Sequence, residues 1–198
     1  MNINVEGFHS NRLHLQTIIE KFDPDFITLQ ETWLFKYQTS DIDKHFPNYN
    51  SASKSVDDED PFIPYKAPRG YGGISTLWKK SITGVTVHPD STNRILTVEH
   101  EDLAITNVYL PCRGTYSHQE YCEEIDKLTE RSTQQDGSKH IILGDFNIDV
   151  IKQNDRRARY FKDFITDFEL RDLKSDQKNT FHDKAGRFDS RIDYIFFN

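Results

Sequence analysis

The sequence predicts an α/β fold in which two packed mixed β-sheets are flanked by helices. Short β-rich runs recur along the chain, and three segments carry apolar residues at helical spacing, one near each end and one in the middle. A helix with one apolar face needs a surface to cover, so strands grouped between helices favour a layered structure. At 198 residues the chain can bury one sizeable core, and its length requires no second domain.

The first predicted unit is a strand, a helix and a second strand. Residues 3–5 form the first strand, and Ser10 is positioned to cap a helix with an apolar stripe. That stripe consists of Leu15, Ile18, Ile19 and Phe22. Asp23-Pro24 ends the helix, because proline cannot continue it. Residues 26–29 form a short apolar strand, which places Glu31 just past a strand end.

Residues 36–72 form the longest polar stretch and are predicted to be a surface loop. The stretch holds an acidic run at 57–60 and four prolines, which disfavour regular structure. After it the pattern changes to β-rich runs separated by turn residues. These predicted strands span residues 74–78, 85–88, 95–99 and 103–109.

The last third of the chain combines two helices with two strands. Ser117 and Glu120 fit a capping box at the start of a helix, and Asp155 precedes another. The apolar faces are Tyr121, Ile125 and Leu128 on the first helix and Ala158, Phe161, Phe164, Ile165 and Phe168 on the second. Residues 140–143 and 192–197 are predicted strands.

Composition indicates a soluble globular protein, with 35% hydrophobic and 29% charged residues. No apolar run reaches the roughly 18 residues that a membrane helix needs, so no membrane partner is expected. Cys112 and Cys122 are too few for a disulfide framework, which favours a reducing, intracellular compartment. The net charge of −7 argues against nucleic-acid binding by bulk attraction, but a metal-dependent enzyme needs clustered carboxylates.

The strongest local signal for chemistry is Asp145 followed by Asn147, directly after a buried strand. The carboxylate can orient or deprotonate a water molecule, and the carboxamide can donate to a phosphoryl oxygen without adding negative charge. The competing structural interpretation is an Asx turn that closes the strand.

Other polar residues stand beside predicted strand ends, namely Asn4, Glu6, Glu31, Tyr109 and Asp193. Glu31 with a neighbouring amide can hold magnesium, since hard cations prefer carboxylate oxygens and keep several waters. The phenol of Tyr109 can reach a phosphate. Asp193 interrupts an apolar strand and requires a partner for its charge. Taken singly, each has an ordinary explanation, such as a solvated carboxylate or a core tyrosine.

The order of these residues resembles the endonuclease/exonuclease/phosphatase superfamily, which includes pancreatic deoxyribonuclease and the apurinic/apyrimidinic endonucleases. The matching segments are residues 4–8, 25–33, 70–74, 107–112, 141–147 and 190–196, which span nearly the whole chain. Trp78-Lys79-Lys80, residues 107–112 and Thr180-Phe181 ahead of 190–194 most resemble the endonuclease domains of LINE-type retrotransposons.

This resemblance implies a deoxyribonuclease-like sandwich that hydrolyses phosphodiesters with Mg²⁺, or Mn²⁺ as an alternative, and nicks DNA. The matching residues are Glu31, Asn4 and Glu6 for the metal and Asp145, Asn147, Tyr109, Asp193 and Asn4 for catalysis. Asp145 would position the attacking water, and Asn147 and Tyr109 would contact the phosphate. Asp193 would orient a catalytic histidine.

The histidine is the main departure from the family pattern. Relatives carry it in a Ser-Asp-His motif on a later strand, whereas none of the eight histidines here follows Asp193. Cys112 also stands where many repair-type relatives have asparagine. We therefore expect residues 1–198 to be the domain truncated at its C-terminus and slightly at its N-terminus, lacking the final strand and impaired in activity. In a retroelement, a reverse-transcriptase domain would follow and the enzyme would act in the nucleus.

Two alternatives stay open. The chain is an inactive fragment or relic of the fold, which the absent Ser-Asp-His favours, or a phosphatase or phosphodiesterase of the superfamily acting on RNA or inositol phosphates. A phosphoinositide enzyme should carry extra basic residues near its substrate motifs, and the sequence lacks them.

Overall fold

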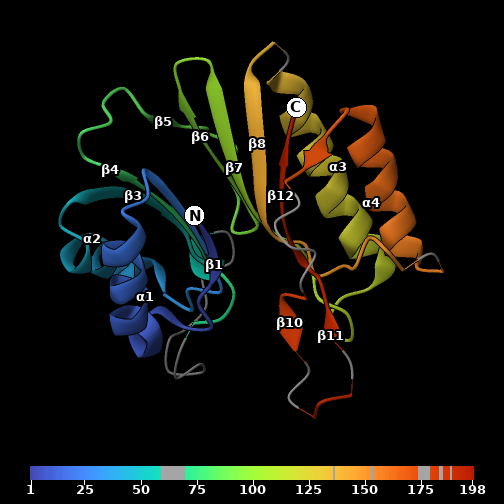
Figure 1. The fold of residues 1–198 in the computed structure, drawn as a ribbon, viewed down its shortest axis with the longest axis horizontal. Helices are drawn as coiled ribbons and strands as arrows, with labels where there is room; N and C mark the ends of the chain where they lie inside the picture. Colours follow the sequence, from blue (N-terminus) through green and yellow to red (C-terminus); the bar gives the residue numbers. More distant parts are fainter. Residues whose placement is uncertain (59–69, 136, 153, 174–178, 183–184, 188) are drawn as a thin grey trace.

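The computed structural model of the chain describes residues 1–58, 70–135, 137–152, 154–173, 179–182, 185–187 and 189–198. Two sheets face one another, and helices cover the outer face of each (Figure 1). This confirms the predicted α/β architecture of two packed mixed sheets flanked by helices. Within the described ranges, every helix is too short or too polar to cross a bilayer.

The first sheet has the strand order β1-β2-β4-β3. Its strands are β1 (Asn2–Asn4), β2 (Phe26–Gln30), β3 (Tyr49–Lys54) and β4 (Ile74–Lys79). β1 runs parallel to β2, and the other neighbours are antiparallel. Helices α1 (Phe8–Phe22) and α2 (Ser40–His45) pack on its outer face. Their apolar side chains join those of the sheet in a core that includes Phe8, Leu15, Ile27, Leu29 and Ile42.

The second sheet has the order β5-β6-β7-β8-β12-β9. Its strands are β5 (Thr86–Val87), β6 (Ile95–His100), β7 (Leu103–Tyr109), β8 (Lys139–Asp145), β9 (Arg171–Asp172) and β12 (Asp193–Phe197). β7 and β8 are parallel, and their neighbours are antiparallel. Helices α3 (His118–Gln134) and α4 (Arg156–Asp167) cover this sheet on its outer side. A hairpin of β10 (Phe181–His182) and β11 (Asp189–Ser190) precedes β12.

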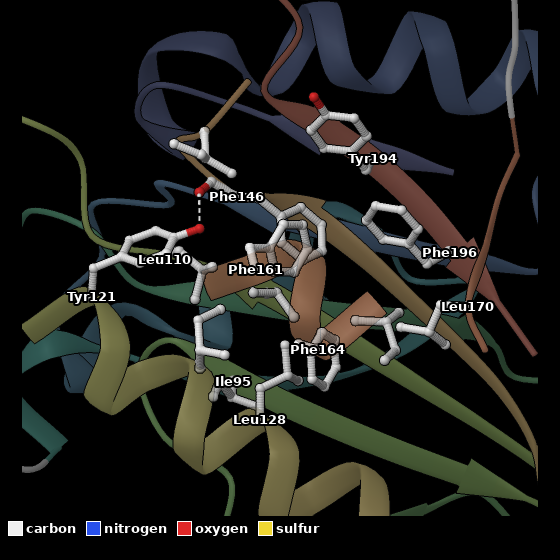
Figure 2. Close-up of a cluster of buried hydrophobic side chains, with 14 of the residues drawn as sticks. Ile95, Leu110, Tyr121, Leu128, Phe146, Phe161, Phe164, Leu170, Tyr194 and Phe196 are labelled. Carbon is white, nitrogen blue, oxygen red and sulfur yellow. Dashed lines mark hydrogen bonds between the residues drawn. The ribbon is translucent and has the colours of Figure 1, made fainter. Parts of the chain in front are cut away.

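The core beneath α3 and α4 is rich in aromatic rings. Phe146, Phe161, Tyr194 and Phe196 pack together with ring centres 4.8 to 5.9 Å apart (Figure 2). Tyr121 donates its hydroxyl to the Phe146 carbonyl at 3.3 Å. Because Phe146 directly follows β8, this packing anchors the segment that carries Asp145 and Asn147.

Residues 36–72 are not simply a surface loop, so that prediction was wrong. Besides short 3₁₀ turns at Lys36–Gln38 and Val56–Asp58, this stretch contains α2 and β3. Ile42 is fully buried under the first sheet, and β3 pairs along its whole length with β4. A polar edge strand lacks the apolar alternation that marks a central strand, which explains the miss. Residues 59–69 lie outside the described residues.

The start of the first helix also differs from the prediction. α1 begins at Phe8 with Gly7 as its N-cap residue, so Ser10 lies inside the helix and caps nothing. Phe8 is buried and draws the helix start toward the core, whereas Phe22 at the far end is 64% exposed. The other predicted caps are confirmed, with Ser117 accepting from the Glu120 amide and Asp155 capping α4.

Candidate active site

The predicted site residues lie where strands of both sheets end at one edge of the sandwich. Asn4 ends β1, which runs parallel to β2, so Glu31, the residue after β2, lies beside it. Tyr109 lies opposite Asp145 because β7 and β8 are parallel and end together. β12 begins at Asp193, opposite the same aspartate. The strand directions therefore bring carboxylates from both sheets to one place.

The side-chain amide of Asn4 joins the two sheets at this edge. Its Nδ2 donates hydrogen bonds to Glu31 Oε1 and to Asp145 Oδ2, each 2.9 Å long. Glu31 follows a strand of the first sheet, and Asp145 ends a strand of the second. Asn4 Oδ1 accepts from the Glu6 backbone N–H at 3.2 Å, which sets the direction of the amide. One side chain thus holds two carboxylates that the chain separates by more than a hundred residues.

Asp145 is oriented by a turn as well as by Asn4. Its Oδ1 accepts from the backbone N–H of Asn147 at 2.9 Å, which is an Asx turn. Asn147 Nδ2 donates to the Leu110 carbonyl at 2.9 Å. The Asx turn that the sequence suggested as a purely structural role for Asp145 is therefore present. The same turn orients the carboxylate toward Asn4 and the site. A phosphate contact by the Asn147 amide stays a prediction.

Left-handed backbone conformations gather at this edge. Seven non-glycine residues have positive φ among those described, and Glu6, Glu31, Trp33 and Asn147 are four of them. A side chain in this region costs about 1–2 kcal/mol, so such conformations persist only where surrounding contacts hold them. Their concentration at one edge of the sandwich is typical of a functional site.

The carboxylates of β8 and β12 have raised pKa values. Burial is the main cause for Asp145 and the charge of Asp193 is the second, while hydrogen bonds from Asn147 and Asn4 oppose them, and the pKa of Asp145 rises to about 7. Burial likewise raises the pKa of Asp193. Two facing carboxylates cannot both ionise without cost, so the pair retains a proton near neutral pH. Loss of that proton would leave two negative charges side by side, and a cation bound here would offset them.

Tyr109 presents a protonated phenol to the same edge. Burial, followed by the charges of Glu31 and Asp145, raises the pKa of its hydroxyl well above the ordinary value. The hydroxyl therefore remains a hydrogen-bond donor throughout the physiological pH range. In the described part of the chain it makes no hydrogen bond, so a bound oxygen could accept one from it.

A cavity of about 220 Å³ opens beside Glu31 and Tyr109. Aromatic rings form much of its wall, namely those of Trp33, Tyr71, Tyr109 and Tyr116. Arg94 is the one cation among the described lining residues. Its guanidinium lies 4.6 Å from the centre of the Tyr116 ring and 5.6 Å from that of Tyr109. Rings and a guanidinium together suit a ligand with flat groups and negative charge.

Sequence reasoning missed Arg94 and Tyr116. The position of Arg94 could have been inferred from the β6–β7 hairpin. In this hairpin the Tyr109 N–H donates to the Arg94 carbonyl at 2.8 Å. Counting pairs back from the hairpin turn places Arg94 opposite the predicted tyrosine. Tyr116 had no such signal, because Arg157 of α4 holds its loop by donating to three carbonyls within residues 111–117.

Two predicted features do not join this cluster. The Glu6 side chain is exposed, and the residue lines a separate cavity against α1, so its metal role stays a prediction. No histidine hydrogen-bonds to Asp193 among the described residues; its backbone N–H donates to Thr180 Oγ1 at 3.1 Å. His182, the nearest histidine in sequence, contacts Asp189 at 2.9 Å in the exposed β10–β11 hairpin.

A cavity of about 490 Å³ lies at the other end of β8, between His140 and Asn198. It is larger than the cavity beside Glu31, but it contains none of the predicted site residues. The larger cavity and the predicted residues therefore lie in different places, and the strained, charged edge at Asp145 is the candidate site.

The donor set at this edge fits a magnesium ion held largely through water. Among the described residues, no three His, Cys, Asp or Glu side chains form a ready-made metal cluster. Mg²⁺ commonly takes only one or two carboxylates and completes its shell with water and substrate phosphate. Glu31 uses only Oε1 in its bond with Asn4, and a cation here would favour the ionised form of Asp145, whose pKa is raised by burial first and by the charge of Asp193 second.

Several solved structures share this fold, including the following three. A 3′ phosphatase, NExo, from Neisseria, bound to a product DNA hairpin, has a TM-score of 0.75 at 17% identity, covering 100% of this chain and 85% of its own. A 3′-5′ exonuclease from Neisseria meningitidis has a TM-score of 0.76 at 19% identity with the same coverage, 100% and 85%. An AP endonuclease from Archaeoglobus fulgidus has a TM-score of 0.76 at 16% identity, covering 99% and 84%. At these identities the likeness shows the fold alone.

Two curated relatives from strains of Streptococcus pneumoniae are named exodeoxyribonuclease. Each is 28% identical over 138 residues, a match that covers 57% of this chain and 47% of the relative. The chain thus spans about half the length of the curated relatives it matches. A sequence model described as the Endonuclease/Exonuclease/phosphatase family matches residues 1–198. With its strand-end carboxylates gathered at the meeting of two sheets, the chain belongs to the Endonuclease/Exonuclease/phosphatase family.

Proposed function

We propose that this protein hydrolyses phosphodiester bonds in DNA with Mg²⁺, or Mn²⁺ as an alternative, and that it nicks DNA as a LINE-type retrotransposon endonuclease does. The Asn4 amide carries this proposal, because it holds the carboxylates of Glu31 and Asp145 side by side from two sheets. Family membership supports a hydrolase. The resemblance of residues 78–80, 107–112 and 190–194 supports nicking. The exodeoxyribonuclease relatives and the neighbour bound to a DNA hairpin support DNA as substrate.

Each residue at the edge has a task in this reaction. Asp145 orients the attacking water and accepts its proton as the water oxygen bonds to phosphorus and the bond to the leaving sugar oxygen breaks. The leaving oxygen takes a proton from solvent. The Tyr109 phenol and the Asn147 amide donate hydrogen bonds to phosphoryl oxygens. Asp193 orients a histidine where one is available.

Glu31 and Asn4 are the residues we assign to the metal ion, with Glu6 as a further ligand. When bound, the ion polarises the phosphate and offsets the negative charge of the surrounding carboxylates. Asn4 keeps Glu31 and Asp145 at a constant separation, so the metal ligand and the proton acceptor stay on the same phosphate.

The cavity with Arg94 extends the site to one side of Tyr109. We assign it to the phosphate and ring of a neighbouring nucleotide, since its wall offers aromatic faces and one guanidinium. Arg94→Gln should then raise KM for DNA more than it lowers kcat. If Arg94→Gln lowers kcat more than it raises KM, Arg94 acts in the chemical step rather than in substrate binding.

Nicking of supercoiled plasmid by residues 1–198 in Mg²⁺, with EDTA as the metal-free control, tests the assignment. Asp145→Asn and Glu31→Gln should each lower the rate by roughly 10² or more, as expected when a proton acceptor or a metal ligand is lost. Asp102→Asn is the matched control, because this exposed aspartate pairs with Lys139 at the far end of β7 and β8. Retained nicking in either site variant would place the chemistry elsewhere.

The choice of substrate and the products formed separate the alternatives. Faster cleavage of RNA or an inositol phosphate than of DNA would favour the phosphatase or phosphodiesterase interpretation. Product release only from 3′ ends would replace nicking by an exonuclease or 3′ phosphatase activity. No cleavage of any of these substrates would support an inactive relic of the fold.

A further inference from the structure

The side chains between the two sheets change from apolar to polar toward the site. Farther from the site the space between the sheets is filled by apolar side chains, including Trp78, Val98 and Ile105. Close to the site it holds the amide side chains of Gln30 and Asn107, both with 0% exposure. Gln30 directly precedes Glu31 on the first sheet, and Asn107 lies two residues before Tyr109 on the second. A buried polar layer therefore stands immediately behind the catalytic edge.

These two amides hydrogen-bond directly from sheet to sheet. Gln30 Nε2 donates to Asn107 Oδ1 at 2.7 Å and to Asn2 Oδ1 at 2.8 Å. Asn107 Nδ2 donates to the carbonyls of Ser75 at 3.0 Å and Leu29 at 3.2 Å, both in the first sheet. One side chain of the second sheet is thus bonded to β2 and β4 of the first, and we name these contacts the Gln30/Asn107 bridge.

Stability alone does not explain the bridge. Gln30 Oε1 is fully buried and has no hydrogen-bond partner among the described residues. An orphaned buried acceptor costs about 1–3 kcal/mol, and replacing both members of a buried pair by apolar groups of similar shape is often neutral or stabilising. Leucine or methionine would continue the apolar layer that already joins the sheets further from the site. The amides therefore serve a purpose other than added stability.

We propose that the Gln30/Asn107 bridge is a positioning device that sets the alignment of the two sheets and thereby maintains the contact between Asn4 and Asp145. Apolar packing has no preferred direction, whereas hydrogen bonds restrict both length and angle. Asn4 pairs with Gln30 in the register of β1 and β2, so a shift of Gln30 against the second sheet carries Asn4 with it.

The catalytic consequence rests on the proposed function, but the geometric consequence does not. A misplacement of about 1 Å can cost about 10² in rate when the reacting groups come from separate elements. Here Glu31 comes with the first sheet, and Asp145 and Tyr109 come with the second. Their separation depends directly on how the sheets are aligned.

Crystal structures of the wild type and of a Gln30→Met/Asn107→Leu double variant test the geometry. The apolar pair removes the bridge together with the orphaned oxygen, so the variant should fold with similar stability. The distance from Asn4 Nδ2 to Asp145 Oδ2, now 2.9 Å, should lengthen beyond hydrogen-bond range. The Asn4 to Glu31 bond lies within one sheet and should stay at 2.9 Å. An unchanged Asn4 to Asp145 distance would overturn the proposal.

Gln30→Met alone is the second variant if the double variant does not fold, because it leaves Asn107 bonded to the first sheet. Thr97→Val is the matched control. It breaks a buried 2.9 Å hydrogen bond to Thr106 within the second sheet, on the face turned away from the first. It should lower stability while leaving the distance between Asn4 and Asp145 unchanged.

Plasmid nicking supplies the kinetic readout. The bridge variants should lower kcat by about 10-fold or more, while KM for DNA changes much less, because the DNA-facing side chains are untouched. Thr97→Val should leave kcat close to the wild-type value. An equal loss of kcat in this control would show a general effect of stability and overturn the positioning role. A wild type without activity would refute the proposed function, and the crystallographic distances would still decide whether the bridge aligns the sheets.

Discussion

Single residues at the edge where Asn4 contacts Glu31 and Asp145 carry features that oppose folding. Glu31 and Asn147 have left-handed backbones, and Asp145 is 3% exposed yet faces a second carboxylate. Elsewhere in the described chain, buried side chains are mostly apolar or fully hydrogen-bonded. Residues that break local rules in this way are typical of functional sites, and under the proposed function their strain and burial orient a water-activating carboxylate.

The raised pKa of Asp145 predicts how the metal-free protein responds to pH. The folded-state pKa of about 7 exceeds the ordinary value of 3.8, so between these values the unfolded chain loses a proton that the folded protein keeps. The stabilising contribution is therefore complete below pH 3.8 and is lost as pH rises through about 7. Thermal unfolding in EDTA across this range should show that Asp145→Asn removes the decline and raises Tm at pH 8.

Tm must be measured for both the wild type and Asp145→Asn, because other carboxylates make the protein more stable, not less, as pH rises. Glu120, for example, accepts from the Ser117 N–H, which lowers its pKa and stabilises the fold at higher pH. The difference in Tm, variant minus wild type, should therefore rise from pH 4 to pH 7. A constant difference would mean that Asp145 is already ionised in the metal-free folded protein.

At the scale of secondary-structure elements, the connection from β1 to α1 positions part of the cavity beside Glu31. Gly7 has φ 99° and precedes the first residue of α1. A Cβ at this position would lie 2.5 Å from Cε3 of Trp33. The helix start and the indole are thus in direct contact, and Trp33 lines the cavity beside Glu31.

Gly7→Ala should destabilise the protein more than Gly84→Ala does. Both glycines have positive φ, but nothing lies within 4 Å of a Cβ at Gly84, so that variant reports the backbone cost alone. The additional loss from forcing Trp33 aside should be about 1–3 kcal/mol, the usual range for overpacking. Urea unfolding measures both values. Equal losses would show that the indole moves aside without cost.

At the scale of the whole molecule, the site exists only where the two sheets meet. Asn4 and Glu31 come from one sheet, and Tyr109, Asp145 and Asp193 come from the other. Neither sheet alone carries both Glu31, the proposed metal ligand, and Asp145, the proposed proton acceptor. Conditions that separate or slide the sheets should therefore abolish activity before they unfold either core.

The contacts of Asp193 predict weak activity for residues 1–198 alone, because no described histidine bonds to it. If a longer polypeptide supplies a Ser-Asp-His after residue 198, it should nick plasmid about 10²–10³ faster, the usual value of one electrostatic group at a phosphate. His182→Ala should leave the rate of residues 1–198 unchanged, since His182 is engaged with Asp189. A strong loss in that variant would assign the histidine role to His182.

The sequence by itself determined the α/β class, the strand ends that carry Asn4, Glu31, Tyr109, Asp145 and Asp193, and the caps at Ser117 and Asp155. Each of these follows from spacing within one element, where the physical interactions are between near neighbours in the chain. The same local logic failed at α2 and β3, because a short helix and a polar edge strand have little apolar periodicity of their own.

Only the tertiary structure decided which of these strand ends meet. The Asn4 bond to Asp145 spans 141 positions, and no local spacing specifies it. The Gln30/Asn107 bridge, the stacking of Arg94 on Tyr116 and the start of α1 against Trp33 likewise depend on how two sheets pack. Periodicity reveals which face of an element is buried, but the partner and the alignment are set by the shape and hydrogen bonding of surfaces that are distant in the chain.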